Sequence, residues 1–208
     1  ITQFFSERKL LLAEYFPNHW GYYKSAMNFF EESLFTLVDP LFDTDIANIN
    51  KRNWLMPDEV TNNSLDAVFL FEALDRTFDP FKCLKIVSNS LKPGGLCFIT
   101  CLLSSGFEVK LLGQKSEIFV PPERMNLLSY EGMISLIKLI DDFEILEFST
   151  PGVLDIPNVE KQIDNVSNSH FFDYIFKKRQ DSELLNSFQE FLQINRLGTF
   201  GRLVLRKY

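Results

Sequence analysis

Two acidic residues close apolar runs near the start of the chain, where a carboxylate could bind a ligand. Glu14 follows the run at 10–13, and Asp39 ends the strand-like run at 34–40. A carboxylate can accept two hydrogen bonds in parallel. Asp39 is the best-placed single binding residue. The alternative is an acidic turn residue ahead of Pro40.

Histidine is the side chain that most often moves a proton at neutral pH, and the chain has only two. His19 lies in a turn-like stretch after the first apolar run, and His170 precedes Phe171 and Phe172. His19 could face a substrate, and His170 could belong to a lid over one. A solvated loop position for His19 and a structural position for His170 are the alternatives, so the sequence assigns no catalytic base.

Strands alternate with helices along the chain, which predicts an α/β domain around a mostly parallel sheet. The expected strands are at 10–14, 34–40, 65–71, 96–103, 143–150 and, as an edge strand, 201–208. The expected helices are at 22–33, 79–91, 129–141 and 181–193, with Asp79 and Ser129 as N-caps and a tight turn from Lys92 to Gly95. We expect one domain over 1–208, in which 104–128 and 151–178 form substrate-side insertions or a small lid.

Composition narrows the class of partner. The net charge of −7 argues against a nucleic-acid partner, because phosphate binding relies on clustered Lys and Arg. Cys83, Cys97 and Cys101 form no C-x-x-C pair, which predicts buried free thiols, no metal site and a reducing, cytoplasmic location. No apolar run approaches the roughly 20 residues that cross a bilayer. The chain opens at Ile1 rather than at a methionine, which leaves room for an upstream segment.

The segment 65–100 resembles the class I S-adenosylmethionine (SAM)-dependent methyltransferases, of the type 11/12-like group. In that family a Phe–Asp pair opens a strand, a Leu–Glu–His loop follows it, and a Leu–Lys–Pro–Gly–Gly turn opens the next strand. The corresponding residues here are Leu65-Asp66, Leu74-Asp75-Arg76 and Leu91 to Gly95. Residues 107–123 and 149–156 are similar to a subgroup associated with sugar, polysaccharide or small-metabolite methylation.

The resemblance implies a three-layer Rossmann-like fold, with a mostly parallel seven-stranded sheet, an antiparallel last strand, and SAM across the carboxyl ends of the first strands. Asp39 would accept hydrogen bonds from the ribose hydroxyls. Asn53, Trp54 and Leu55 would contact adenine, and the alternative for them is a surface loop. Phe71 and Glu72 would line the methyl-donor side, and the alternative for Phe71 is a core position. The full set of cofactor-binding candidates is Glu14, Phe16, Asn18, Gly21, Asp39, Asn53, Trp54, Phe71 and Glu72.

The sequence departs from the family in its first motif, acid-x-Gly-x-Gly-x-Gly. With Glu14 at the acid, Phe16, Asn18 and Trp20 stand where glycines belong, and Gly21 comes one residue late. Glycine at these positions lets the backbone approach the ligand closely. The alternative for this loop is an ordinary strand-to-helix connection without a ligand.

Two positions that often carry histidine in the family hold Arg76 and Arg124. Arginine cannot act as a base at neutral pH, although it can bind a carboxylate or phosphate. The leading hypothesis is a SAM-dependent methyltransferase with a small-molecule or carbohydrate-related acceptor and no nucleic-acid or membrane partner. The alternative is a catalytically inactive methyltransferase-like binding or regulatory module. A nicotinamide-dependent oxidoreductase is weaker, because pyrophosphate binding needs a glycine-rich helix start.

Overall fold

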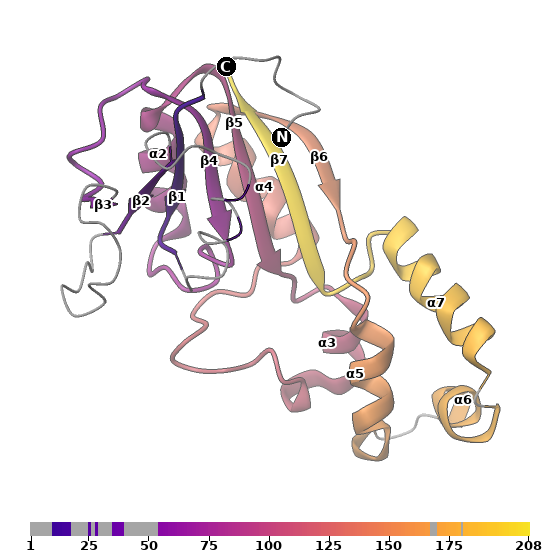
Figure 1. The fold of residues 1–208 in the computed structure, drawn as a ribbon. Helices are drawn as coiled ribbons and strands as arrows, with labels where there is room; N and C mark the ends of the chain where they lie inside the picture. The colour runs from indigo at the N-terminus through magenta and orange to yellow at the C-terminus, as the bar shows by residue number, and fades with distance from the viewer. Residues whose placement is uncertain are drawn as a thin grey trace.

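A seven-stranded sheet forms the centre of the fold (Figure 1). The computed structural model describes residues 10–17, 25, 28, 35–39, 54–166, 170–179 and 181–208. The strands stand in the order β3-β2-β1-β4-β5-β7-β6, and β7 runs opposite to the other six strands. Their bounds are β1 Leu12–Tyr15, β2 Phe35–Val38, β3 Trp54–Leu55, β4 Leu65–Phe71, β5 Leu91–Leu102, β6 Phe143–Ser149 and β7 Phe200–Lys207. The predicted fold class and the antiparallel last strand are confirmed.

The central strands are apolar because both of their faces are covered. All four residues of β1 are buried, and so are the first six residues of β4. Successive side chains alternate between the two faces, so Ala13 and Tyr15 join one core cluster while Leu12 joins the other. Glu14 therefore points to the same face as Leu12.

The predicted turn from Lys92 to Gly95 lies inside β5 rather than before it. Leu65 pairs with Leu91 and Ala67 pairs with Leu96, so the extra residues of β5 form a bulge. Gly94 has a φ of +78°, which is the left-handed backbone that glycine tolerates best. The strand begins at Leu91, earlier than predicted, because the backbone resumes pairing with β4 on both sides of the bulge.

The prediction that the last strand lies at an edge is wrong. β7 lies between β5 and β6, and β6 forms the edge. Its alternating pattern arises because Leu203 and Leu205 are buried while Arg202 and Arg206 are exposed on the other face. Each arginine forms an ion pair with a glutamate of β6, so an exposed sheet face, rather than an edge position, explains the charges.

Helices α2 (Pro80–Ser90) and α4 (Tyr130–Ile140) pack on one sheet face through the larger core cluster. Both begin where the sequence predicts. The Asp79 carboxylate accepts a hydrogen bond from the Lys82 amide at 2.9 Å, and the Ser129 hydroxyl accepts one from the Gly132 amide at 3.0 Å. Of the predicted helix at 22–33, only residues 25 and 28 are among those described.

A second group of helices lies beyond the carboxyl ends of β5 and β6 (Figure 1). It contains α3 (Phe107–Leu112), α5 (Asp155–Gln162), α6 (His170–Asp173) and α7 (Ser182–Ile194). A short 3₁₀ turn follows α3 at Gly113–Lys115, and another follows α5 at Ile163–Asn165. A π-helical turn at Tyr174–Arg179 lies between α6 and α7. These helices share a core of their own, formed by Leu112, Ile156, Val159, Ile163, Phe176 and Leu192. We call them the helical cluster.

Candidate functional site

The carboxyl ends of β1, β2, β4 and β5 meet at one edge of the sheet, because these strands are parallel. The residue that follows each of the first three strands is a predicted site residue: Phe16, Asp39 and Glu72. Backbone hydrogen bonds hold all three at that edge. The Phe16 amide donates to Val38 O at 2.8 Å, and the Glu72 amide donates to Thr100 O at 2.9 Å. The Asp39 amide donates to Leu55 O at 3.2 Å.

Phe16 has the backbone conformation of a glycine. It stands at the first glycine position of the family motif, and its φ is +54°. A left-handed conformation costs a residue with a Cβ roughly 1–2 kcal/mol. The Phe16 ring packs against the core and meets the Tyr15 ring edge to face, with centroids 6.0 Å apart. The loop therefore begins with a left-handed residue at the first glycine position of the motif, although that residue is a phenylalanine.

This strain gives a test with two matched variants. Phe16→Gly and Phe16→Ala both remove the ring, but only the glycine variant relieves the left-handed backbone. We expect Phe16→Gly to be about 1 kcal/mol more stable than Phe16→Ala in urea unfolding, although glycine usually lowers stability relative to alanine. Equal stability, or a more stable alanine variant, would contradict a left-handed Phe16.

Glu14 is a buried carboxyl group without a polar partner. Its neighbours across the sheet are Leu37 on β2 and Phe69 on β4. The residue is fully buried, and neither carboxylate oxygen has a hydrogen-bond partner in the structure as described. Burial raises the pKa of Glu14 from 4.5 to about 8. A pKa of about 8 leaves this carboxyl mostly protonated at neutral pH, and a cationic ligand at this end of β1 would favour its ionised form.

The other cofactor-binding candidates divide into two groups. Trp54 pairs with Leu37, and both Trp54 and Phe71 pack against the second core cluster. The Phe71 ring lies 5.4 Å from that of Phe69, centroid to centroid. These two side chains therefore contribute apolar surface next to the edge. The cofactor-binding candidates Asn18, Gly21 and Asn53 lie outside the described residues, and so does the catalytic candidate His19.

Arg76 and Arg124 belong to an ion-pair network that joins the loop after β4 to the segment at 123–126. Arg124 donates to Asp75 Oδ2 at 2.6 Å and to Glu72 Oε2 at 2.8 Å. Arg76 pairs with Glu123, and its guanidinium lies 3.8 Å from Glu72 Oε2. Both arginines are thus engaged with carboxylates of the protein itself.

Asp75 is the central acid of this network, and sequence reasoning did not single it out for this role. Its side chain is 1% exposed, and the oxygen that Arg124 contacts, Oδ2, also accepts a hydrogen bond from the Leu102 amide at 3.2 Å. Burial raises the pKa of Asp75, while the Leu102 hydrogen bond and the charge of Arg124 oppose that rise. Asp75 stands at the family's Glu position, but its partner Arg124 is 49 residues away.

A cavity of about 420 Å³ opens beside Glu72 at the same sheet edge. Its walls come from the ends of β4 and β5, from α3 and α5, and from the start of β7. The polar residues in the wall are Glu72, Glu108, Asp155, Asn158 and Thr199. Apart from Glu72, none of them has a local signal in the sequence, because the fold gathers them from separate elements.

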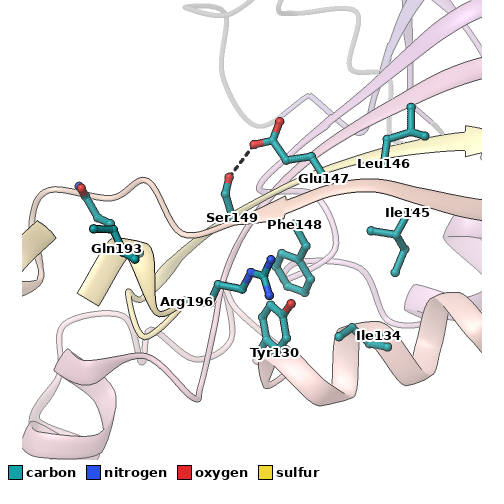
Figure 2. A pocket seen from close by; sticks show the side chains of 10 residues that line it. Tyr130, Ile134, Ile145, Leu146, Glu147, Phe148, Ser149, Gln193 and Arg196 are labelled. Atoms are coloured by element: carbon teal, nitrogen blue, oxygen red, sulfur yellow. Dashed lines mark hydrogen bonds between the residues drawn. The ribbon is translucent and has the colours of Figure 1, made fainter. Parts of the chain in front are cut away.

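A larger pocket, of about 540 Å³, lies beside the edge strand β6 (Figure 2). Tyr130 stacks on Phe148 with centroids 4.2 Å apart, and the Arg196 guanidinium lies 5.8 Å from the centre of the Tyr130 ring. Four strands of the sheet order separate β6 from β2, so this pocket lies away from Phe16 and Asp39. It is a cleft between α4, β6 and the end of α7, and it does not contain the predicted cofactor residues.

The remaining candidates are peripheral. His170 is exposed at the start of α6, on the side of the helical cluster away from β1 and β2 (Figure 1). The three cysteines are buried and free, as predicted. In the ranges that the structure describes, no three His, Cys, Asp or Glu residues are grouped as a metal site requires. None of the helices described there is long and apolar enough to span a membrane.

No protein-family model and no curated protein matches the chain. Solved structures do match it. A SAM-dependent methyltransferase from Mesorhizobium loti is 11% identical, with a TM-score of 0.58 over 95% of this chain and 91% of that one. Phosphoethanolamine N-methyltransferase 2 from Haemonchus contortus, solved with S-adenosylhomocysteine, is 16% identical, with a TM-score of 0.56 over 99% of this chain and 51% of that one.

The chain therefore has the fold of the class I SAM-dependent methyltransferases, the family that residues 65–100 resemble. A further match is the [4+2]-cyclase SpnF, which is 12% identical, with a TM-score of 0.55 over 95% of this chain and 75% of that one. Proteins with this fold thus include one that is named for a different reaction. Activity must be argued from the site itself.

Proposed function

We propose that this protein is a SAM-dependent methyltransferase that acts on a small-molecule acceptor, a class that includes carbohydrate-related compounds. The observation that carries the proposal is the buried, unpartnered carboxyl group of Glu14, one strand away from Asp39 and next to the left-handed Phe16. SAM has cationic groups at its methionine end and a diol on its ribose. Glu14 and Asp39 match these two features by charge and by hydrogen-bonding capacity.

Each cofactor-binding candidate that the structure describes has a role in this proposal. Glu14 would balance the positive charge of the methionine end, and the Phe16 backbone would approach the ligand closely. Asp39 would accept hydrogen bonds from the ribose, while Trp54 and Phe71 would provide apolar contacts. Asn18, Gly21 and Asn53 belong to the same proposal on the basis of the sequence. The three buried free cysteines support a reducing compartment such as the cytoplasm.

When bound, SAM supplies an electrophilic methyl group on a sulfonium, so the protein has to position an acceptor in line with it. Glu72 follows β4 at the carboxyl ends of the parallel strands, where the cofactor is proposed to bind, and it also lines the cavity of about 420 Å³. The helical cluster lies beyond the carboxyl ends of β5 and β6 (Figure 1), where it would keep water from the acceptor. We propose that the segments 104–128 and 151–178 contribute this substrate side.

The alternative function is a catalytically inactive module that binds a ligand without transferring a methyl group. It is favoured by Phe16 at a glycine position and by the commitment of Arg76 and Arg124 to ion pairs. The two functions differ in turnover. An active enzyme consumes SAM when an acceptor is present, whereas an inactive module binds the cofactor and leaves it intact.

The test common to both functions is calorimetric titration with S-adenosylhomocysteine, using Asp39→Ala as the variant. Binding that requires Asp39 supports a cofactor site at this sheet edge. A folded protein that binds neither SAM nor S-adenosylhomocysteine would overturn the methyltransferase proposal.

A further inference from the structure

We propose that the cavity beside Glu72 binds an amine, with the nitrogen toward the carboxylates and an apolar body against the apolar lining residues. The cavity would then be the acceptor site, where the ammonium would have to give a proton to a neighbouring carboxylate before its nitrogen lone pair could take the methyl group from the sulfonium. In this role the inference rests on the proposed function. The cavity encloses about 420 Å³, which suits a small molecule rather than a polymer chain. It adjoins the carboxyl ends of β4 and β5, where the fold places its ligands.

The wall of the cavity is negatively charged. Glu72, Glu108 and Asp155 line it, and none of the described lining residues is Lys, Arg or His. Glu108 accepts hydrogen bonds from the Ser116 hydroxyl and from Asn158 Nδ2, the second at 2.8 Å. These donors are neutral, so they satisfy the oxygens without cancelling the charge.

The carboxylate of Asp155, like that of Glu108, is contacted by neutral donors. Its Oδ1 accepts the Thr199 amide at 2.8 Å, and its Oδ2 lies 3.4 Å from Gln189 Nε2. Neither Asp155 nor Glu108 forms an ion pair with another described residue. Two buried carboxylates with neutral donors leave an uncompensated negative potential, which attracts a cation and repels an anion.

Glu72 presents one open acceptor. Its Oε2 is held by Arg124, but its Oε1 accepts no hydrogen bond from the described part of the chain. The Glu72 side chain is 21% exposed, and its φ of +52° is a strained conformation for a residue with a Cβ. Backbone strain of this kind is concentrated at functional sites. The strained backbone and the ion pair together fix Glu72 at the cavity wall.

The rest of the wall is apolar. Leu102, Ile118 and Phe200 line it, and Val153 and Leu154 are both more than half exposed. The hydroxyl oxygen of Thr199, another lining residue, is buried and has no hydrogen-bond partner in the structure as described. A ligand with a charged nitrogen and a compact apolar body matches this combination better than a polyhydroxylated or acidic one. Within the proposed class of small-molecule acceptors, the cavity therefore favours amines over carbohydrate-related compounds.

Three probes of nearly equal size test this inference: benzylammonium, benzyl alcohol and benzoate. Binding to the full chain is measured by NMR titration, without cofactor. We expect benzylammonium to bind about tenfold more tightly than either other probe, and Glu72→Gln to weaken its binding about threefold to tenfold. The matched control is Glu131→Gln, which removes the same charge from an exposed position on α4 and should leave binding unchanged.

Tighter or equal binding of benzoate or benzyl alcohol to the unmodified protein would overturn the proposal, and this comparison requires no variant to fold. Undiminished benzylammonium binding by folded Glu72→Gln would also overturn it. Because the titration contains no cofactor, its outcome is independent of the S-adenosylhomocysteine titration. A protein that binds benzylammonium but no S-adenosylhomocysteine would keep the amine site and lose the methyltransferase function.

Discussion

Replacing Glu14 with glutamine is expected to remove a large part of the fall in stability between pH 5 and pH 8. Glu14 has a folded-state pKa of about 8, against 4.5 for an ordinary glutamate. Because the folded-state pKa is the higher one, the stability that this group contributes is fully present below about pH 4.5. It is lost as the pH rises toward 8, because the unfolded chain ionises first.

The size of this effect follows from the pKa difference. Each unit is worth about 1.4 kcal/mol, so the free energy of unfolding should fall by roughly 3–5 kcal/mol across this window through Glu14 alone. Urea unfolding at pH 5 and pH 8 measures the difference, with Glu131→Gln as the control for an exposed glutamate. If Glu14→Gln loses as much stability with rising pH as the unmodified protein, Glu14 is not the buried, unpartnered acid described here.

The second large effect is expected for Arg124→Met. Arg124 is the cation that contacts the buried Asp75 carboxylate, at 2.6 Å. Removing it leaves a charge that is 1% exposed without its partner, which costs about 3–5 kcal/mol of unfolding free energy. The matched control is Arg76→Met. The partner of Arg76, Glu123, is 55% exposed, so losing this ion pair should lower the free energy of unfolding by less than about 1 kcal/mol.

A double variant separates charge from packing. Asp75→Asn combined with Arg124→Met removes both charges, so it should recover part of the stability that Arg124→Met loses. All variants are compared by urea unfolding at one pH. If Arg124→Met loses no more stability than Arg76→Met, Arg124 does not stabilise the buried Asp75 carboxylate. The same conclusion follows if the double variant loses more stability than the two single variants together.

Much of the fold could be predicted because its signals are local. The apolar run at 65–71 and the capping residues Asp79 and Ser129 act over a few positions, and the structure confirms each of them. The place of β7 was not predictable in this way. An alternating strand looks the same at an edge as between two neighbours when only one of its faces is buried.

The candidate site was predicted only in part, for a related reason. Asp39, Phe16 and Glu72 follow strands, so the alternation of strands and helices brings them to one edge. The pairing of Asp75 with Arg124, and the joining of Glu108 to Asp155 in one cavity, depend on contacts between distant segments. The left-handed backbone of Phe16 was also not predictable from the sequence, because phenylalanine rarely adopts this conformation.

The most direct test of the central claim, a SAM site at the carboxyl ends of β1 and β2, is calorimetric titration with S-adenosylhomocysteine. We expect one ligand to bind per chain, about tenfold or more weakly in Asp39→Ala, because a carboxylate that accepts two hydrogen bonds is lost. Absence of binding by protein shown to be folded would contradict the claim. Binding that is undiminished in Asp39→Ala would contradict the assignment of the ribose site.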